Sequence, residues 1–312
     1  MIKPAFLIQL FVFSIVSTHA LVDYGEQEST PVVKRVSRPK SKPRAISRGS
    51  TGAKSSGNSS GINSIQFKTS YQSMDVAIDN AEGAQKYGLI QIQGKIDTSY
   101  NFYVMGDYWQ GRITESADRS KGADQKGNPS LRVGLKWFES GGKQDGTRAD
   151  LIAGLSMGQS DSEIAHSRDD RIFGLTTYKR FFNMVLLLSG EYRDTGTPEN
   201  SSHLSIGNIL GLTASLGWIV SNDIRMSLSA HRYRISQGNP SDQNPLLETI
   251  SVATLVPRLS LTLVPMVELD IYGVFRTNKP VLAQGQDLTE ARLLDIPGAY
   301  GNTIGASIGL SL

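Results

Sequence analysis

Residues 204–220 have the sequence LSIGNILGLTASLGWIV, in which apolar side chains alternate with small or polar ones. One parity holds Leu204, Ile206, Leu210, Leu212, Ala214, Leu216, Trp218 and Val220. The other holds Ser205, Gly207, Gly211, Thr213, Ser215 and Gly217. Because successive side chains of a strand point to opposite faces, this stretch predicts a β-strand with one apolar face and one small, polar face.

The same two-residue period recurs from residue 62 to the end of the chain. Residues 303–312 repeat it, with Ile304, Ala306, Ile308, Leu310 and Leu312 on one face. We predict twelve strands in all, centred near Phe67, Ile92, Val104, Val133, Ala153, Thr176, Leu187, Leu212, Leu228, Ala253, Ile271 and Ile308. An even number of strands is typical of a closed, single-chain bacterial barrel.

The connections between these strands alternate in length. Tight turns are expected near 98–99, 180–183, 221–223 and 265, and a somewhat longer one at 139–147. The intervening connections are long, at 74–86, 112–128, 158–169, 194–202, 236–246 and 278–298. This pattern predicts an all-β fold over residues 61–312, a transmembrane antiparallel up-and-down β-barrel of about twelve strands, with its short turns and both termini in the periplasm.

The first twenty residues have the pattern of a secretory signal peptide. Lys3 precedes an apolar run at 5–16, and Thr18, His19 and Ala20 form a small-x-small cleavage site. The run is shorter than the roughly 20 residues that span a bilayer, which disfavours the alternative of a membrane anchor. We therefore predict export from a Gram-negative cytoplasm, with cleavage after Ala20.

Residues 21–60 differ in composition from the rest of the chain. Residues 34–54 carry eight basic side chains and no acidic one, interleaved with proline, serine and glycine. Such a segment is expected to be disordered in the periplasm. Its charge predicts binding to an anionic periplasmic polymer, and the alternative is a solvated spacer.

Aromatic residues are expected to form two girdles at the membrane interfaces. The periplasmic girdle would contain Trp137, Tyr178 and Trp218, and the outer girdle Tyr192, Tyr233 and Phe275. The partners of this outer surface would be outer-membrane lipid and lipopolysaccharide.

The inward parity of the predicted strands collects charged residues. The bases are Lys68, Lys95, Arg132, Lys136, Arg171, Lys179 and Arg225, and the acids are Asp97, Asp107, Asp150, Glu191, Glu268 and Asp270. Fixed charges of this kind orient and select solutes in channels. Alternatively, the opposite charges pair and close the lumen, since twelve strands lie between a filled and a water-filled barrel.

Two short motifs resemble those of known outer-membrane proteins. Residues 303–312 resemble the C-terminal signal by which such barrels reach the barrel-assembly machinery, although Leu312 stands where an aromatic residue is usual. His203-x-Ser205 resembles the histidine–serine motif of outer-membrane phospholipase A, in which serine is the nucleophile and histidine the base. Ile206 replaces the motif's asparagine, and we assign no catalytic residue.

No cofactor or metal site is predicted. The chain has no cysteine, and His19, His166, His203 and His231 have no metal-ligand spacing. No phosphate loop and no nucleic-acid platform is present in the sequence. The leading hypothesis is a small porin-like channel for hydrophilic solutes. The alternatives are a closed structural or surface-display barrel that binds partners through its long loops, and a phospholipase-like enzyme.

Overall fold

The computed structural model describes residues 61–77, 84–115, 124–142, 144–162, 164–283, 285–286 and 288–312. The predicted signal peptide (1–20) and basic segment (21–60) lie outside the described residues.

The regular structure of the described chain is almost entirely β-strand. Its strands are β1 Ile62–Ala77, β2 Ala84–Thr98, β3 Phe102–Glu115, β4 Asp124–Lys126, β5 Ser130–Ser140, β6 Thr147–Ser156, β7 Asp170–Phe181, β8 Met184–Thr195, β9 Ile209–Ile219, β10 Ile224–Ile235, β11 Ile250–Val264, β12 Val267–Arg276 and β13 Thr303–Ser311. One 3-10 helix, η1, spans Leu288–Ala291. Each predicted strand centre falls within one of these strands. No helix among the described residues is long and apolar enough to span a bilayer.

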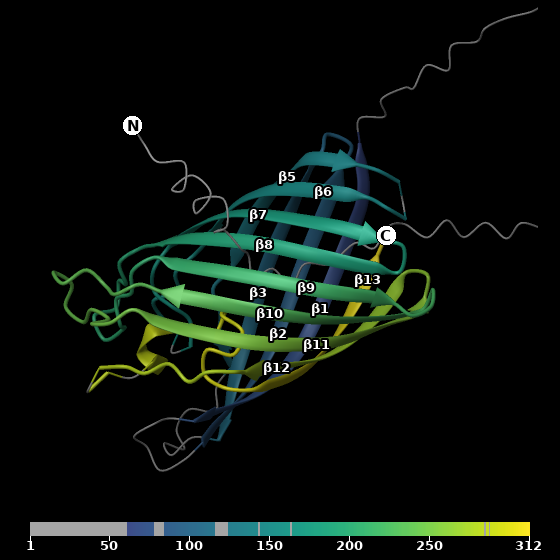
Figure 1. Cartoon of the computed structure of the whole chain (residues 1–312). Helices are drawn as coiled ribbons and strands as arrows, with labels where there is room; N and C mark the ends of the chain where they lie inside the picture. Colours follow the sequence, from purple (N-terminus) through teal and green to yellow (C-terminus); the bar gives the residue numbers. More distant parts are fainter. Residues whose placement is uncertain are drawn as a thin grey trace, which may run out of the picture.

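Twelve of the strands close into an antiparallel barrel. Each pairs with its neighbours along the chain, and β1 closes the ring by pairing with β13, so that Gln66 lies opposite Ser311 and Met74 opposite Thr303. The short strand β4 adds to the end of β3 through Gln110 to Arg112. Figure 1 shows the ring of strands from the side. The predicted fold is therefore confirmed.

The two-residue period of the sequence sets the two faces of the wall. In β9, Leu212, Ala214 and Trp218 point outward, whereas Gly211 and Thr213 are buried. In β13, Ile304 and Ile308 are more than half exposed while Ser307 is buried. An apolar outer surface is what a barrel needs where no water is available to solvate polar groups.

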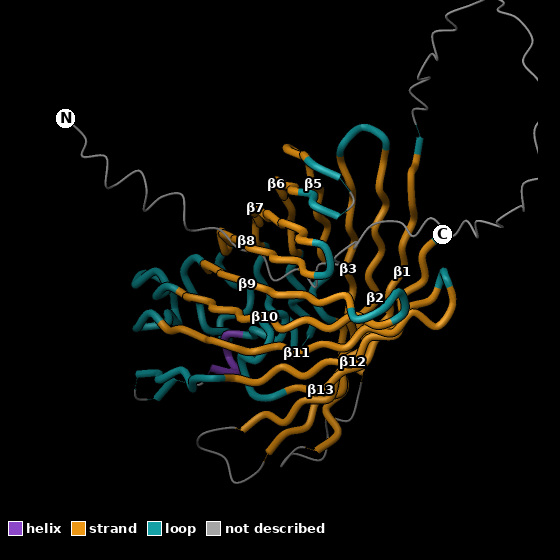
Figure 2. The backbone as a smooth tube through the Cα atoms, turned by 45° about the vertical axis from the view of Figure 1, so that its right-hand side comes forward, coloured by secondary structure: helices purple, strands orange, loops and turns teal. Residues whose placement is uncertain are grey.

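The connections that the structure describes in full or nearly so have the predicted asymmetry. Strands β1 to β4 extend into the predicted loops 74–86 and 112–128, of which residues 78–83 and 116–123 lie outside the described residues. The turns at 99–101, 182–183, 220–223 and 265–266 are short, and that at 141–146 is slightly longer. At the opposite rim, 157–169, 196–208, 236–249 and 277–302 are long. These long connections gather with η1 at one end of the barrel, as Figure 2 shows in teal and purple.

The inner wall brings aromatic rings over glycines of neighbouring strands. Tyr103 on β3 lies opposite Gly134 on β5, and a Cβ on Gly134 would lie 2.1 Å from the Tyr103 ring. Tyr272 lies over Gly305 in the same way, with 2.5 Å to its ring. Only glycine permits these rings to lie flat along the wall.

The four long connections fold together into what we call the loop cap, residues 157–169, 196–208, 236–249 and 277–302. Its apolar core packs against inward side chains near the ends of β1, β2, β3, β9, β10 and β11. The cap contributes Ile164, Leu204, Ile206, Leu246, Ala291, Leu293, Ile296, Ala299 and Tyr300 to this core. Packed side chains therefore narrow the barrel at this end.

The cap corrects part of the predicted β9 strand. Leu204 and Ile206 were expected to face lipid, but they are 0% and 3% exposed within the cap. Strand β9 begins only at Ile209. Upstream of it, backbone hydrogen bonds such as that from Leu204 N to Glu290 O, at 2.9 Å, join the chain to another segment of the cap.

Two predicted girdle residues face inward instead. Tyr178 alternates inward with Thr176, and its ring lies 5.6 Å from the Arg148 guanidinium. Tyr233 is 1% exposed and belongs to the apolar core of the cap. The outward positions of the other four are as predicted, and these are Trp137, Tyr192, Trp218 and Phe275.

Candidate functional site

The lumen collects most of the charges predicted for it. The structure places Lys68, Lys95, Asp97, Arg132, Lys136, Asp150, Glu191, Arg225, Glu268 and Asp270 on the inward face, together with Asp107. All the side chains of this set that form ion pairs are at most 32% exposed.

Arg171 and Lys179 lie elsewhere, and their predicted lumenal position is wrong. Both share the outward parity of β7 with Phe173. The Arg171 side chain is 71% exposed and lies 3.9 Å from Asp194, while Lys179 pairs with Asp145 of a short turn. The parity of β7 was misassigned by one residue, which reverses the direction of every side chain in the strand.

Ion pairs fill the half of the lumen nearer the short turns. Asp97 on β2 forms ion pairs with Lys95 and with Lys136 of β5, both at 3.0 Å. Asp150 accepts from Arg148 through both oxygens, at 2.6 and 2.7 Å. Arg225 donates to Glu268 at 2.5 Å. Charge is therefore balanced locally rather than separated into two opposed walls.

Asp270 is the centre of a further buried network. It accepts from the Lys68 ammonium and from the Ser307 hydroxyl at 3.1 Å through one oxygen. Its other oxygen accepts from Ser260 at 2.5 Å. These bonds join β1, β11, β12 and β13 across the closing seam of the barrel.

A second ion cluster lies beneath the loop cap and was not predicted as a unit. Three guanidinium groups, of Arg132, Arg168 and Arg193, lie near three carboxylates, of Asp170, Glu191 and Asp295. Arg193 hydrogen-bonds Glu191 at 2.9 Å and also Asp295 of the cap. Arg168 donates to the Ala291 carbonyl at 3.1 Å. The cluster therefore ties two cap segments to the barrel wall.

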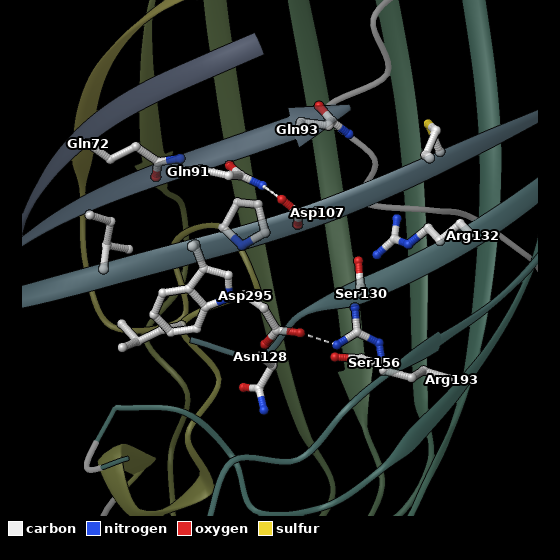
Figure 3. A pocket seen from close by; sticks show the side chains of 15 residues that line it. Gln72, Gln91, Gln93, Asp107, Asn128, Ser130, Arg132, Ser156, Arg193 and Asp295 are labelled. Carbon is white, nitrogen blue, oxygen red and sulfur yellow. Dashed lines mark hydrogen bonds and ion pairs between the residues drawn. The ribbon is translucent and has the colours of Figure 1, made fainter. Parts of the chain in front are cut away.

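Below the cap, the lumen contains a cavity of about 80 Å³. Figure 3 shows Arg132, Asp107, Gln91 and Gln93 around it, with the Arg193–Asp295 pair at its border. Its remaining lining is Gln72, Leu89, Met105, Trp109, Asn128, Ser130, Ser156, Leu294 and Pro297. We call this space the lumenal cavity. At about 10–15 Å³ for each water, it accommodates roughly five to eight waters or one small solute.

The structure does not bring His203 and Ser205 together as a catalytic pair. The Ser205 hydroxyl hydrogen-bonds Asp242, and His203 Nδ1 lies 3.1 Å from the Ser167 hydroxyl. Ser167 also accepts from the Asn200 backbone N–H at 3.1 Å. His203, Ser205 and Ser167 are all buried. Their contacts therefore hold segments of the cap to one another.

Burial also sets the protonation of the cap. Burial, followed by the nearby Arg292 and Arg168, lowers the pKa of His203 to about 4. Burial and Arg168 likewise lower the pKa of His166 well below its ordinary value. Although burial opposes it, attraction from the Arg193 and Arg168 guanidinium groups lowers the pKa of Asp295 to about 2. At neutral pH the cap therefore holds neutral histidines and an ionised Asp295.

No group of three or more potential metal ligands occurs among the residues that the structure describes. The ionic residues missed by sequence reasoning were Arg148, Arg168, Asp170, Arg193 and Asp295. Arg193 and Arg148 alternate inward with residues that were predicted, so their parity was available from the sequence. The pairing of Arg193 with Asp295 carried no such signal, because it joins positions 102 residues apart.

Comparison with known proteins locates the fold. No family model matches the chain, and no curated protein matches its sequence. Among solved structures, it is similar to the COG4313 outer membrane channel from Pseudomonas putida F1, at 9% identity and a TM-score of 0.56, over 80% of this chain and 95% of that one. This likeness establishes a shared barrel fold.

Other barrels of the outer membrane are more distant. The NanC porin has 7% identity and a TM-score of 0.45, over 80% of this chain and 98% of that one. Outer membrane phospholipase A from Escherichia coli has 12% identity and a TM-score of 0.37, over 78% and 89%. The chain therefore has the fold of a closed antiparallel β-barrel, which it shares with the COG4313 outer membrane channel.

Proposed function

We propose that this protein is an outer-membrane channel for the passive passage of small hydrophilic solutes, narrowed at one end by its loop cap. The observation that supports it is the lumenal cavity, which is solute-sized and bordered by Arg132, Asp107, Gln91 and Gln93 inside a charged barrel. Polar and ionic walls lower the cost of moving a hydrated solute through a low-dielectric layer.

The orientation follows from the two rims. The short turns and both chain termini would face the periplasm. The loop cap would lie outside the cell, as the long loops of bacterial outer-membrane barrels usually do. The mature protein should then fractionate with outer membranes and migrate faster on a denaturing gel before boiling than after. Recovery as a soluble periplasmic protein would contradict this location.

Single-channel recording in planar bilayers tests passage directly. We expect a small, resolvable conductance from the wild-type protein. Asp295→Ala, which removes the cap's bond to Arg193, should raise the conductance because the cap is held less firmly. Arg171→Gln is a matched control, since Arg171 lies on the outer face. Absence of current from both the folded wild-type protein and Asp295→Ala would overturn the channel proposal.

A second candidate is a closed barrel that displays its outer loops. The observation that favours it is the apolar core of the cap, which buries Leu204, Leu293 and Ile296 almost completely. Lumenal charges that pair with one another also suit a filled interior. This candidate predicts no current from any of the three proteins in the recording above.

A further inference from the structure

The lumenal cavity has two chemically different polar groups on adjacent strands. Arg132 on β5 and Asp107 on β3 are both inward, with Asp107 opposite Ser130 and Met105 opposite Arg132. They are therefore diagonal neighbours on adjacent strands. In this geometry the two Cα atoms are about 7–8 Å apart. No ion pair joins them in the structure, and Figure 3 shows both at the border of the same space.

Arg132 retains hydrogen-bonding capacity. Its Nη1 lies 3.8 Å from Glu191 Oε2, beyond hydrogen-bonding distance, and its Nε has no partner among the described residues. The other Glu191 oxygen accepts two bonds from Arg193, at 3.2 and 2.9 Å. The Arg132 side chain is only 11% exposed. A nearly buried guanidinium with unused donors favours an anionic acceptor, above all a carboxylate.

The other groups of the cavity accept hydrogen bonds or offer an amide. Asp107 Oδ1 accepts from Gln91 Nε2 at 2.7 Å, which orients the carboxylate and leaves its Oδ2 for a further donor. Gln93 lies beside it on β2. By contrast, the Asn128 amide is committed to the backbone of Met157 and His166. The indole of Trp109 supplies an apolar side to the cavity.

We propose that the lumenal cavity binds a small carboxylate that also carries a hydrogen-bond donor close to its acid group, an α-hydroxy or α-amino acid. The carboxylate binds Arg132, and the hydroxyl or ammonium group binds Asp107. The volume of about 80 Å³ fits such a solute. This solute class deepens the proposed channel function and depends on it only for entry to the cavity.

Tryptophan fluorescence measures occupancy without any ion flow. The chain has three tryptophans, of which Trp109 lines the cavity while Trp137 and Trp218 face outward. In folded W137F/W218F protein in detergent, lactate and alanine should each change the Trp109 emission saturably. Propionate lacks the hydrogen-bond donor and glycerol lacks the acid group, so both should change the Trp109 emission less. No saturable response, or an equal response to propionate, would overturn the proposal.

Variants identify the recognising groups. Arg132→Gln in that background should weaken the apparent affinity for lactate and alanine about tenfold or more, the loss expected for charge-assisted hydrogen bonds. Arg132→Lys, which keeps the charge but loses the planar fork, should be intermediate. Asp107→Asn should weaken alanine more than lactate, because only alanine carries an ammonium group. Heat-dependent migration verifies that each variant is folded.

Arg171→Gln in the same background is the matched control and should leave both affinities unchanged. Unaltered binding in folded Arg132→Gln would overturn the assignment. Saturable binding without current in planar bilayers would support the binding site and contradict the channel proposal. Current without saturable binding of lactate or alanine would support the channel and contradict the proposed solute class.

Discussion

The Arg193 guanidinium, on strand β8, hydrogen-bonds the carboxylate of Asp295, which lies 102 residues further along the chain in the loop cap. Arg193 is 2% exposed and also holds Glu191 on its own strand. Two bonds of Arg168 accompany this link, one to the Ala291 carbonyl within the cap and one to Asp170 at the start of β7. A buried ionic contact therefore adds to the apolar packing and the hydrogen bonds that hold this loop.

The first prediction concerns this contact. Asp295→Ala should destabilise the loop cap by about 3 kcal/mol, the lower end of the cost of removing one partner of a buried pair, because Arg193 keeps Glu191. Trypsin cleavage after Arg292 in the folded protein measures the opening of the cap. Arg171→Gln should leave the cleavage rate unchanged, and equal rates in wild type and Asp295→Ala would contradict the role of the pair.

The second prediction concerns pH. His203 has a folded-state pKa of about 4 against an ordinary value of 6.5, so between these values the unfolded cap binds more protons than the folded one. The stability of the cap should therefore fall as the pH drops from about 6.5 to 4. Cleavage by an acid-active protease across this range measures it. His203→Gln should make the profile shallower, with the remaining slope due to His166, and an unchanged profile would contradict the role of His203.

The third prediction concerns the two faces of β9. Leu212 points outward and Ser215 inward, where Ser215 accepts a hydrogen bond from Ser229 at 2.8 Å. Leu212→Arg should cost about 2–4 kcal/mol of folding free energy in lipid, as a cation on the lipid face does, and Ser215→Arg should cost less. Urea unfolding in vesicles provides both values. Equal penalties at the two positions would show that the assigned faces are wrong.

The fourth prediction concerns the closing seam. Asp270→Leu leaves the Lys68 ammonium buried without its ion-pair partner and should destabilise the barrel by about 3–5 kcal/mol. Lys68→Met should cost less, because Asp270 keeps its hydrogen bonds from Ser260 and Ser307. A double-mutant cycle in urea should show strong coupling. Additive effects would mean that the pair does not act as a unit.

The fifth prediction concerns ion selectivity. Arg132→Gln combined with Lys136→Gln removes two inward positive charges and should shift the channel toward cations. The shift should shrink between about 0.1 M and 1 M salt, as the Debye length falls from roughly 10 to 3 Å. Reversal potentials in planar bilayers measure it. A shift of the same size from Arg171→Gln with Lys179→Gln, which lie outward, would contradict the lumenal assignment.

The sequence by itself determined the strands, their order and the asymmetry of their connections. Alternation in β9 and β13 fixes which side chains face out, because a period of two has only one assignment once one face is apolar. It does not do so in β7, where Ile172, Phe173 and Leu175 fall on both parities. Arg171, Lys179 and Tyr178 were misassigned for that reason.

Only the tertiary structure decided what the long connections do. Leu204 and Ile206 are apolar in the same alternating pattern as lipid-facing residues, yet they belong to the core of the cap. Tyr233 shares the inward parity of Arg225 on β10 and packs in the same core. Local periodicity cannot distinguish burial against lipid from burial against a folded loop, since both remove apolar surface from water. The lumenal cavity and the Arg193–Asp295 pair likewise arise from contacts between segments far apart in the chain, which depend on how the closed barrel brings them together.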